Sequence, residues 1–204
     1  MNKQMISLLT HERLIVRFFT SWSIGTIFLF AAWFISDAWL PDKFFRFLPG
    51  MVISPVDCDI ESLSETIKIL LWNLLLTGGL CVAASLFSVG RFPSGYVVPW
   101  LLFGIYGGML GTDSFNCSNP LDRAGIDISI LWTRAGFREI TGYLLIPAAM
   151  ANQYLWRQKS FWSTKVERVS RSPDRKSSFD VVIGFAASLG LIAWGAIEEV
   201  FNFI

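Results

Sequence analysis

The sequence predicts an all-α fold: a polytopic membrane bundle of five transmembrane helices, with the N-terminus inside the cell and the C-terminus outside. Of the 204 residues, 53% are apolar and only 16% are charged, and the mean hydropathy is +0.50. This composition excludes a disordered chain and an ordinary water-soluble enzyme. Several charge-free apolar stretches are 16 to 21 residues long, about the length that crosses a bilayer. The distribution of Lys and Arg among the connecting segments sets the orientation.

We interpret the chain as one integral membrane domain, residues 1–204, whose spans follow the apolar stretches. Phe18–Ile35 carries no charge, and Ile69–Val89 carries Asn73 as its main polar residue. Tyr96–Gly111 has 16 residues, about 24 Å as a helix, so it spans a bilayer only with little tilt. The fourth span is the least regular, because Pro147 interrupts it. We expect spans at residues 15–36, 67–89, 95–112, 129–156 and 179–201, and outer loops at 37–66 and 113–128.

The charge distribution predicts a cytoplasmic N-terminus. Segments 1–17, 90–95 and 157–180 lie on one side of a five-span protein, and they hold 11 of the 17 Lys and Arg residues but only 4 of the 16 Asp and Glu residues. By the positive-inside rule this side is the cytoplasm. No small-residue cleavage site follows the first apolar stretch, so we expect the first span to be retained.

The basic cytoplasmic loop at residues 157–178 has two interpretations. Its charges either set the topology and contact lipid phosphates, or they dock a soluble cytoplasmic partner protein. The residues concerned are Arg157, Lys159, Lys165, Arg168, Arg171, Arg175 and Lys176.

Five charged residues form a predicted intramembrane cluster. Arg134, Arg138 and Glu139 open the fourth span near the outer headgroups, and Glu198 and Glu199 end the fifth span at a matching depth. An ionisable side chain within a span costs about 2.5–3.5 kcal/mol and normally has a partner. We therefore expect the arginines to bridge to the glutamates of the fifth span. The alternative is that all five side chains extend to the outer water.

Small and amide residues predict close helix packing. Asn73 is typical of a hydrogen bond between helices, and glycines four residues apart permit two backbones to approach closely. Such faces suit a homo-oligomer as well as packing within one chain. The predicted packing residues are Asn73, Gly78, Gly79, Gly104, Gly107, Gly108, Gly111 and Gly136.

The remaining chemistry indicates a protein that is not an enzyme. Cys58 and Cys117 fall in the two outer loops and could form a disulfide, whereas Cys81 is expected to pack inside a span. The sequence contains no G-x-x-x-x-G-K-[ST], G-x-S-x-G, H-E-x-x-H or C-x-x-C motif, and its single His11 lies beside Glu12 with no second ligand near. We expect no cofactor, no metal ion and no direct nucleic-acid binding.

Two segments resemble the stage II sporulation protein M family. Residues 71–111 contain LWNLLLTGGLCVAASLFSVG and VVPWLLFGIYGGMLG, which resemble the Asn-bearing second helix and the glycine-rich third helix of that family. The segment RAGFREITGYLLIPAAM, with Gly136 and Glu139, resembles its His-Gly-x-x-Glu segment, and WGAIEEVF, with Glu198, resembles its closing helix. Ala135 stands where the family has His, and ANQYLWRQK replaces the usual glycine-rich end of the fourth helix.

The resemblance implies a multi-pass protein of the bacterial inner membrane. The member that names the family resembles a scaffold that recruits peptidoglycan-degrading partners, and relatives resemble membrane subunits beside ATPases or exporters. The expected function is therefore a non-enzymatic membrane scaffold or anchor that assembles as an oligomer and recruits partner proteins. The alternatives are a transport subunit with an ABC-type ATPase, a gated pore, and a membrane sensor or effector of a multi-protein system.

Overall fold

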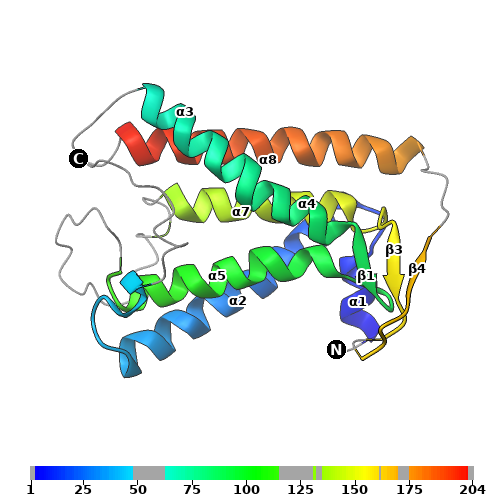
Figure 1. Ribbon diagram of the computed structural model, residues 1–204, viewed down its shortest axis with the longest axis horizontal. Helices are drawn as coiled ribbons and strands as arrows, with labels where there is room; N and C mark the ends of the chain where they lie inside the picture. Colours follow the sequence, from blue (N-terminus) through cyan, green and yellow to red (C-terminus); the bar gives the residue numbers. More distant parts are fainter. Residues whose placement is uncertain are drawn as a thin grey trace.

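The computed structural model describes residues 3–47, 63–114, 131, 135–160, 162–169 and 175–201, and these are mostly helical (Figure 1). After the short helix α1 (Lys3–Leu9), the long helix α2 (Leu14–Trp39) leads to a 3-10 turn at Phe44–Phe47. The next helix is continuous through three parts: α3 (Leu63–Trp72), the π-helical turn η2 (Asn73–Gly78) and α4 (Gly79–Ser85). The remaining elements are β1 (Phe87–Val89), β2 (Phe92–Pro93), the 3-10 turn η3 (Ser94–Tyr96), α5 (Val97–Gly111), α7 (Ala135–Met150), β3 (Trp156–Gln158), β4 (Val166–Arg168) and α8 (Arg175–Phe201).

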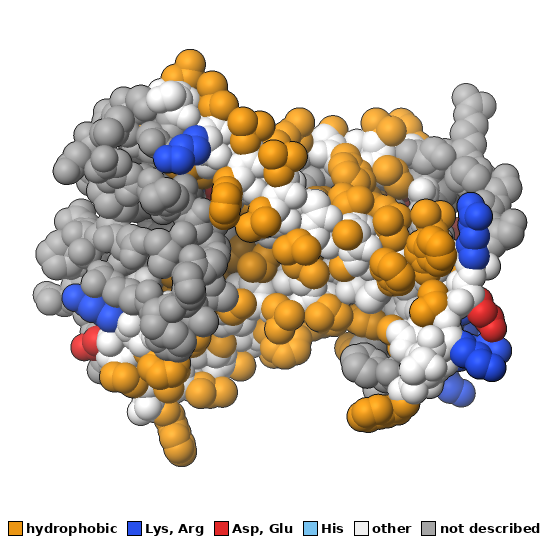
Figure 2. All heavy atoms as spheres, in the orientation of Figure 1, with side chains coloured by type: hydrophobic (Ala, Val, Ile, Leu, Met, Phe, Trp, Pro, Cys, Tyr) orange, Lys and Arg blue, Asp and Glu red, His pale blue; other side chains and the backbone are white. Residues whose placement is uncertain are grey.

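Three of the described helices are long and apolar enough to cross a membrane. They cover Leu14–Trp39, Thr66–Ser85 and Phe179–Glu198, and at most 28% of each apolar window is buried inside the protein. Figure 2 shows hydrophobic side chains over the middle of the visible face, with Lys, Arg, Asp and Glu nearer its two ends. An apolar surface of this extent suits lipid rather than water. The expectation of a helical membrane protein is confirmed at this level.

The long helices run between the same two ends of the molecule (Figure 1). The N-terminus, α1 and the strands lie at one end, which we call the sheet end, and the C-terminus lies at the other. The helices α2 and α5 pack along each other, as do α7 and α8. The helix α7 contacts α2, α4, α5 and α8, and every residue from 142 to 150 is buried. It is therefore the central helix of the bundle.

The expectation of an all-α fold is wrong in one respect, because the sheet end carries a small sheet of strand order β2-β1-β3-β4. The strands β1 and β3 pair in parallel, with Ser88 opposite Arg157, and the β1–β2 and β3–β4 pairs are antiparallel. Gly90 has a φ of 62°, which suits the tight turn between β1 and β2. The α4–α5 connection contains β1 and β2, and the α7–α8 connection contains β3 and β4. Both connections lie at the sheet end, so their backbones can pair and satisfy each other's hydrogen bonds.

Candidate functional site

The central helix α7 carries two adjacent charged residues, Arg138 and Glu139, in its first turns. Arg138 forms an ion pair with Glu198 of α8, and the two side chains are 21% and 15% exposed. The guanidinium carbon of Arg138 lies 5.3 Å from the ring centroid of Trp194, and the indole of Trp194 donates to Glu198 Oε1 at 2.8 Å. The Glu198 carboxylate thus pairs with the Arg138 cation and accepts a hydrogen bond from the neutral indole of Trp194. The Arg138 guanidinium also lies over the face of that indole.

Glu139 faces a different partner. Its Oε1 accepts a hydrogen bond of 2.8 Å from the side-chain amide of Asn73, which is only 2% exposed. On its other side, α8 presents Gly195, where an added Cβ would overlap the Glu139 side chain. The Glu139 carboxylate therefore lies between the side-chain amide of Asn73 and the backbone of α8 at Gly195, which has no side chain. We call Asn73, Arg138, Glu139, Trp194 and Glu198 the charge cluster.

The charge cluster begins where the helix α3–α4 changes to π geometry. The turn Asn73–Gly78 makes i→i+5 hydrogen bonds, and its two ends, Asn73 and Gly78, are buried. A π turn holds one extra residue per turn and is frequent at functional sites. The sequence analysis missed this turn and the Trp194 contact, because neither has a motif; the only available signal was the unusual polar Asn73 in an apolar stretch.

The chemistry that this arrangement supports is charge pairing at a partly buried position. Taking the two charges out of water costs hydration free energy, which their Coulomb attraction and hydrogen bonds largely offset when the geometry is good. Each of the described members of the cluster has a partner. Among the residues that the structure describes, no group of three or more His, Cys, Asp or Glu residues could hold a metal ion.

The sequence analysis also missed a second ion pair, at the sheet end, in which the arginine is buried. Arg17 is 3% exposed and its Nη2 lies 2.7 Å from Asp180 Oδ2, while Nη1 donates to the carbonyl of His11 at 3.0 Å. This pair joins the start of α2 to the start of α8. A usable signal was present, because each residue immediately precedes an apolar stretch on the same predicted side of the membrane.

Three of the four glycines of α5, and Gly136 of α7, pack inside the chain. A Cβ at Gly107 would lie 2.9 Å from the carbonyl carbon of Leu29 on α2, and one at Gly111 would lie 2.7 Å from the carbonyl oxygen of Trp33. Gly108 approaches the ring of Phe45, and Gly136 approaches the ring of Tyr106. These four glycines therefore serve contacts within one chain.

Gly79 and Gly104 face open space, because nothing lies within 4 Å of a Cβ added at either position. At the buried Gly78, an added Cβ would be in ordinary van der Waals contact, 3.5 Å from the nearest atom. The spacing of glycines in the sequence does not distinguish these positions from the packed ones.

The described basic residues of the loop at 157–169 lie on β3, β4 and their connection. Arg157 donates to the hydroxyl of Tyr154, and its guanidinium lies over that ring. Lys159 pairs with Glu167 at 2.9 Å, and Lys165 and Arg168 are exposed.

Several predicted residues lie outside the described set. Arg134, Arg171, Cys58 and Cys117 are outside the described residues, so their ion pair, docking and disulfide roles stay predictions. The same holds for the side chains of Glu199, Arg175 and Lys176, although these residues lie on α8. Cys81 is buried and free.

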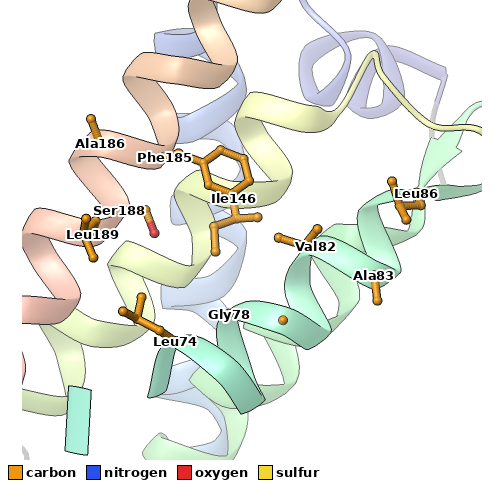
Figure 3. Close-up of a pocket in the computed structure, with 11 residues that line it drawn as sticks. Leu74, Gly78, Val82, Ala83, Leu86, Ile146, Phe185, Ala186, Ser188 and Leu189 are labelled. Atoms are coloured by element: carbon orange, nitrogen blue, oxygen red, sulfur yellow. The ribbon is translucent and has the colours of Figure 1, made fainter. Parts of the chain in front are cut away.

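A groove opens on the side of the bundle between the continuous helix η2–α4 and α8, with Ile146 of α7 between them (Figure 3). Its volume is about 560 Å³. The two walls contain several small residues and one hydroxyl, that of Ser188. The lining residues are Leu74, Gly78, Gly79, Val82, Ala83, Leu86, Ile146, Phe185, Ala186, Ser188 and Leu189.

The chain matches no protein-family model, no curated protein and no solved structure. The similarity to the stage II sporulation protein M family therefore rests only on the residues quoted above.

Proposed function

We propose that the protein is a non-enzymatic scaffold of the bacterial inner membrane that crosses the bilayer five times, assembles with copies of itself and holds partner proteins. The three long apolar helices support membrane insertion. The helices α5 and α7, with 15 and 16 residues, are the two shorter crossings of this proposal. An odd number of crossings agrees with termini at opposite ends of the bundle (Figure 1).

The observation that carries the scaffold proposal is the apolar groove. Its walls belong to two of the candidate membrane helices, so the groove lies at bilayer depth, where its occupant is apolar. Gly78, Gly79 and Ala83 on one wall let another backbone approach closely, as small residues do at helix contacts in membranes. We propose that a transmembrane helix of a second copy occupies it.

The groove lining also favours a scaffold over a pore. A conducting pathway needs polar groups along its length, whereas Ser188 is the single polar side chain among the residues that line this groove. The charged residues described on α7 pair with α8 and with Asn73.

The oligomeric state tests the proposal. Gly79 lines the groove, and a Cβ added there meets no other atom within 4 Å, so the side chain of Gly79→Leu can occupy the groove. Gly190→Leu is the matched control, because Gly190 is equally open but does not line the groove. Light scattering in mild detergent should show an oligomer for the wild type and for Gly190→Leu, and a smaller species for Gly79→Leu. A wild type that is monomeric in both detergent and cross-linked membranes would refute self-assembly. If Gly104→Leu alone dissociates the oligomer, the groove is not the interface.

A transport subunit is the second candidate function, and the π-helical turn beside Glu139 favours it. An ionisable group at a helix irregularity is a common element of ion pathways. Proteoliposomes holding the wild type should then show ion or proton flux above protein-free liposomes, and Glu139→Gln and Glu198→Gln should each reduce it. Flux equal to that of empty liposomes excludes a pore that opens without partners.

A further inference from the structure

One face of the small sheet is exposed and amphipathic. Residues paired across neighbouring strands point to the same face. The register therefore places Phe87, Trp156 and Arg168 in one row that crosses β1, β3 and β4. Phe87 and Trp156 are 45% and 37% exposed and their rings stack, with centroids 6.3 Å apart. On the opposite face, Ser88 of β1 is 1% exposed, so at β1 that face is turned toward the protein. The edge strand β4 is exposed on both faces.

The row changes character with distance from the helices. Phe87 lies two residues after the last residue of α4, and the sheet continues outward through β3 to the edge strand β4 (Figure 1). The aromatic residues are thus nearest the apolar helix surface, and exposed Arg168 is farthest from it. Aromatic rings near the apolar surface and basic groups farther from it are the arrangement that suits a membrane–water interface.

The connection between β3 and β4 adds an aromatic side chain with almost no protein contact. Trp162 is 93% exposed. An indole has a large apolar surface and one N–H donor, and it partitions into the interfacial layer of a bilayer. At the other end of the bundle, α2 ends at Trp39, which is 84% exposed. An exposed tryptophan is thus present at each end of the bundle.

The charge of this region complements an anionic leaflet. The exposed basic residues of the sheet and its turns are Arg91, Lys159, Lys165 and Arg168, and Glu167 is the acidic residue among the described strand and turn positions. Lys159 is paired with Glu167, which leaves a net positive surface. A Lys or Arg at the surface of an anionic membrane contributes about 1 kcal/mol to binding.

We propose that this face, formed by Phe87, Trp156 and Arg168, lies with Trp162 of the adjoining connection in the headgroup layer of the bilayer and binds the phosphates of anionic lipids. The sheet extends the lipid contact of α4 beyond the end of the helix and fixes the depth of that end of the bundle. This inference does not depend on self-assembly or on partner recruitment. A soluble protein bound at the same face is the competing occupant.

The position of Trp162 tests the proposal directly. The full chain, labelled with 5-fluorotryptophan, is placed in nanodiscs of phosphatidylcholine containing phosphatidylglycerol, and Trp162→Phe identifies the fluorine signal. We expect a paramagnetic group on the lipid headgroup to broaden this signal, and a soluble paramagnetic complex to affect it weakly. The half-buried Trp100, which donates to Ser21, is the internal reference: the headgroup probe should broaden its signal less than that of Trp162, and the soluble complex should affect it weakly. A Trp162 signal broadened only by the soluble complex would overturn the proposal and leave the face available to a protein.

Lipid retention tests the charged part. Lys165→Gln with Arg168→Gln should lower the number of phosphatidylglycerol molecules retained in native mass spectrometry by two-fold or more, without changing retention of phosphatidylcholine. The matched control is Lys43→Gln at the opposite end, where the residue is also exposed. Equal loss in the control, or no loss in the double variant, would show that the face does not bind anionic lipid.

Discussion

Replacing Gly107 by Ala tests the packing of α5 against α2 at a single atom. An added Cβ would lie 2.9 Å from the carbonyl carbon of Leu29 and 3.0 Å from its Cα, and nearer still to its oxygen. Real Cβ atoms essentially never come within 3.0 Å of such atoms. The obstructing atoms belong to the backbone, so no side chain can rotate away. The two helices must therefore separate or shift along each other.

The expected loss follows from the cost of overpacking. Extra methyl groups in a well-packed interior destabilise by about 1–3 kcal/mol. Alanine also favours a helix over glycine by about 1 kcal/mol, which partly conceals the clash. Gly104→Ala corrects for this, because it lies on the same helix and its added Cβ meets nothing within 4 Å. We expect Gly107→Ala to be about 1–3 kcal/mol less stable than Gly104→Ala.

Denaturant titration of the purified protein in mixed micelles, followed by circular dichroism and tryptophan fluorescence, measures this difference. Both variants should retain wild-type helicity before unfolding, and Gly107→Ala should unfold at a lower denaturant fraction. Equal stability of the two alanine variants would refute the close approach of α2 and α5 at this residue.

Two further predictions concern buried polar pairs and use the same titration. Arg17→Met leaves the Asp180 carboxylate, which is 18% exposed, without its cation; we expect a loss toward the lower end of about 3–5 kcal/mol. The double variant with Asp180→Leu should recover most of it, and a single variant as stable as the wild type would contradict the pair. Glu139→Leu leaves the buried amide of Asn73 without its acceptor, so we expect the free energy of unfolding to fall by about 1–3 kcal/mol. Glu139→Gln keeps an acceptor oxygen and should lose less; equal losses would show that the hydrogen bond contributes nothing.

The long apolar helices could be predicted from the sequence because their signal is local. The predicted spans at 15–36, 67–89 and 179–201 overlap the candidate membrane helices Leu14–Trp39, Thr66–Ser85 and Phe179–Glu198. Bilayer thickness sets a length that an apolar stretch either reaches or does not reach. In the structure this helix ends at Ser85, and Phe87–Val89 forms the strand β1.

Features that depend on distant residues were predicted less well. The Arg138 contact with Glu198 was expected, because residues of opposite charge at equal depth attract each other. The strands of two or three residues were missed, because they are too short for an alternating pattern and because β1 pairs with β3, which lies far along the chain. The glycine spacing predicted close packing, but only the fold shows that Gly107 is enclosed and Gly104 is open.

The pair between Arg17 and Asp180 has a consequence for biosynthesis. These residues are 163 positions apart, so Arg17 enters the membrane region long before its carboxylate exists. At a synthesis rate of about 5–20 residues per second, the delay is on the order of ten seconds. During that interval Arg17 of α2 has no counter-charge and depends on headgroups, water or the insertion machinery. The ion pair forms only when α8 is inserted, and a ribosome that stalls before Asp180 leaves a nascent chain that is exposed to quality control.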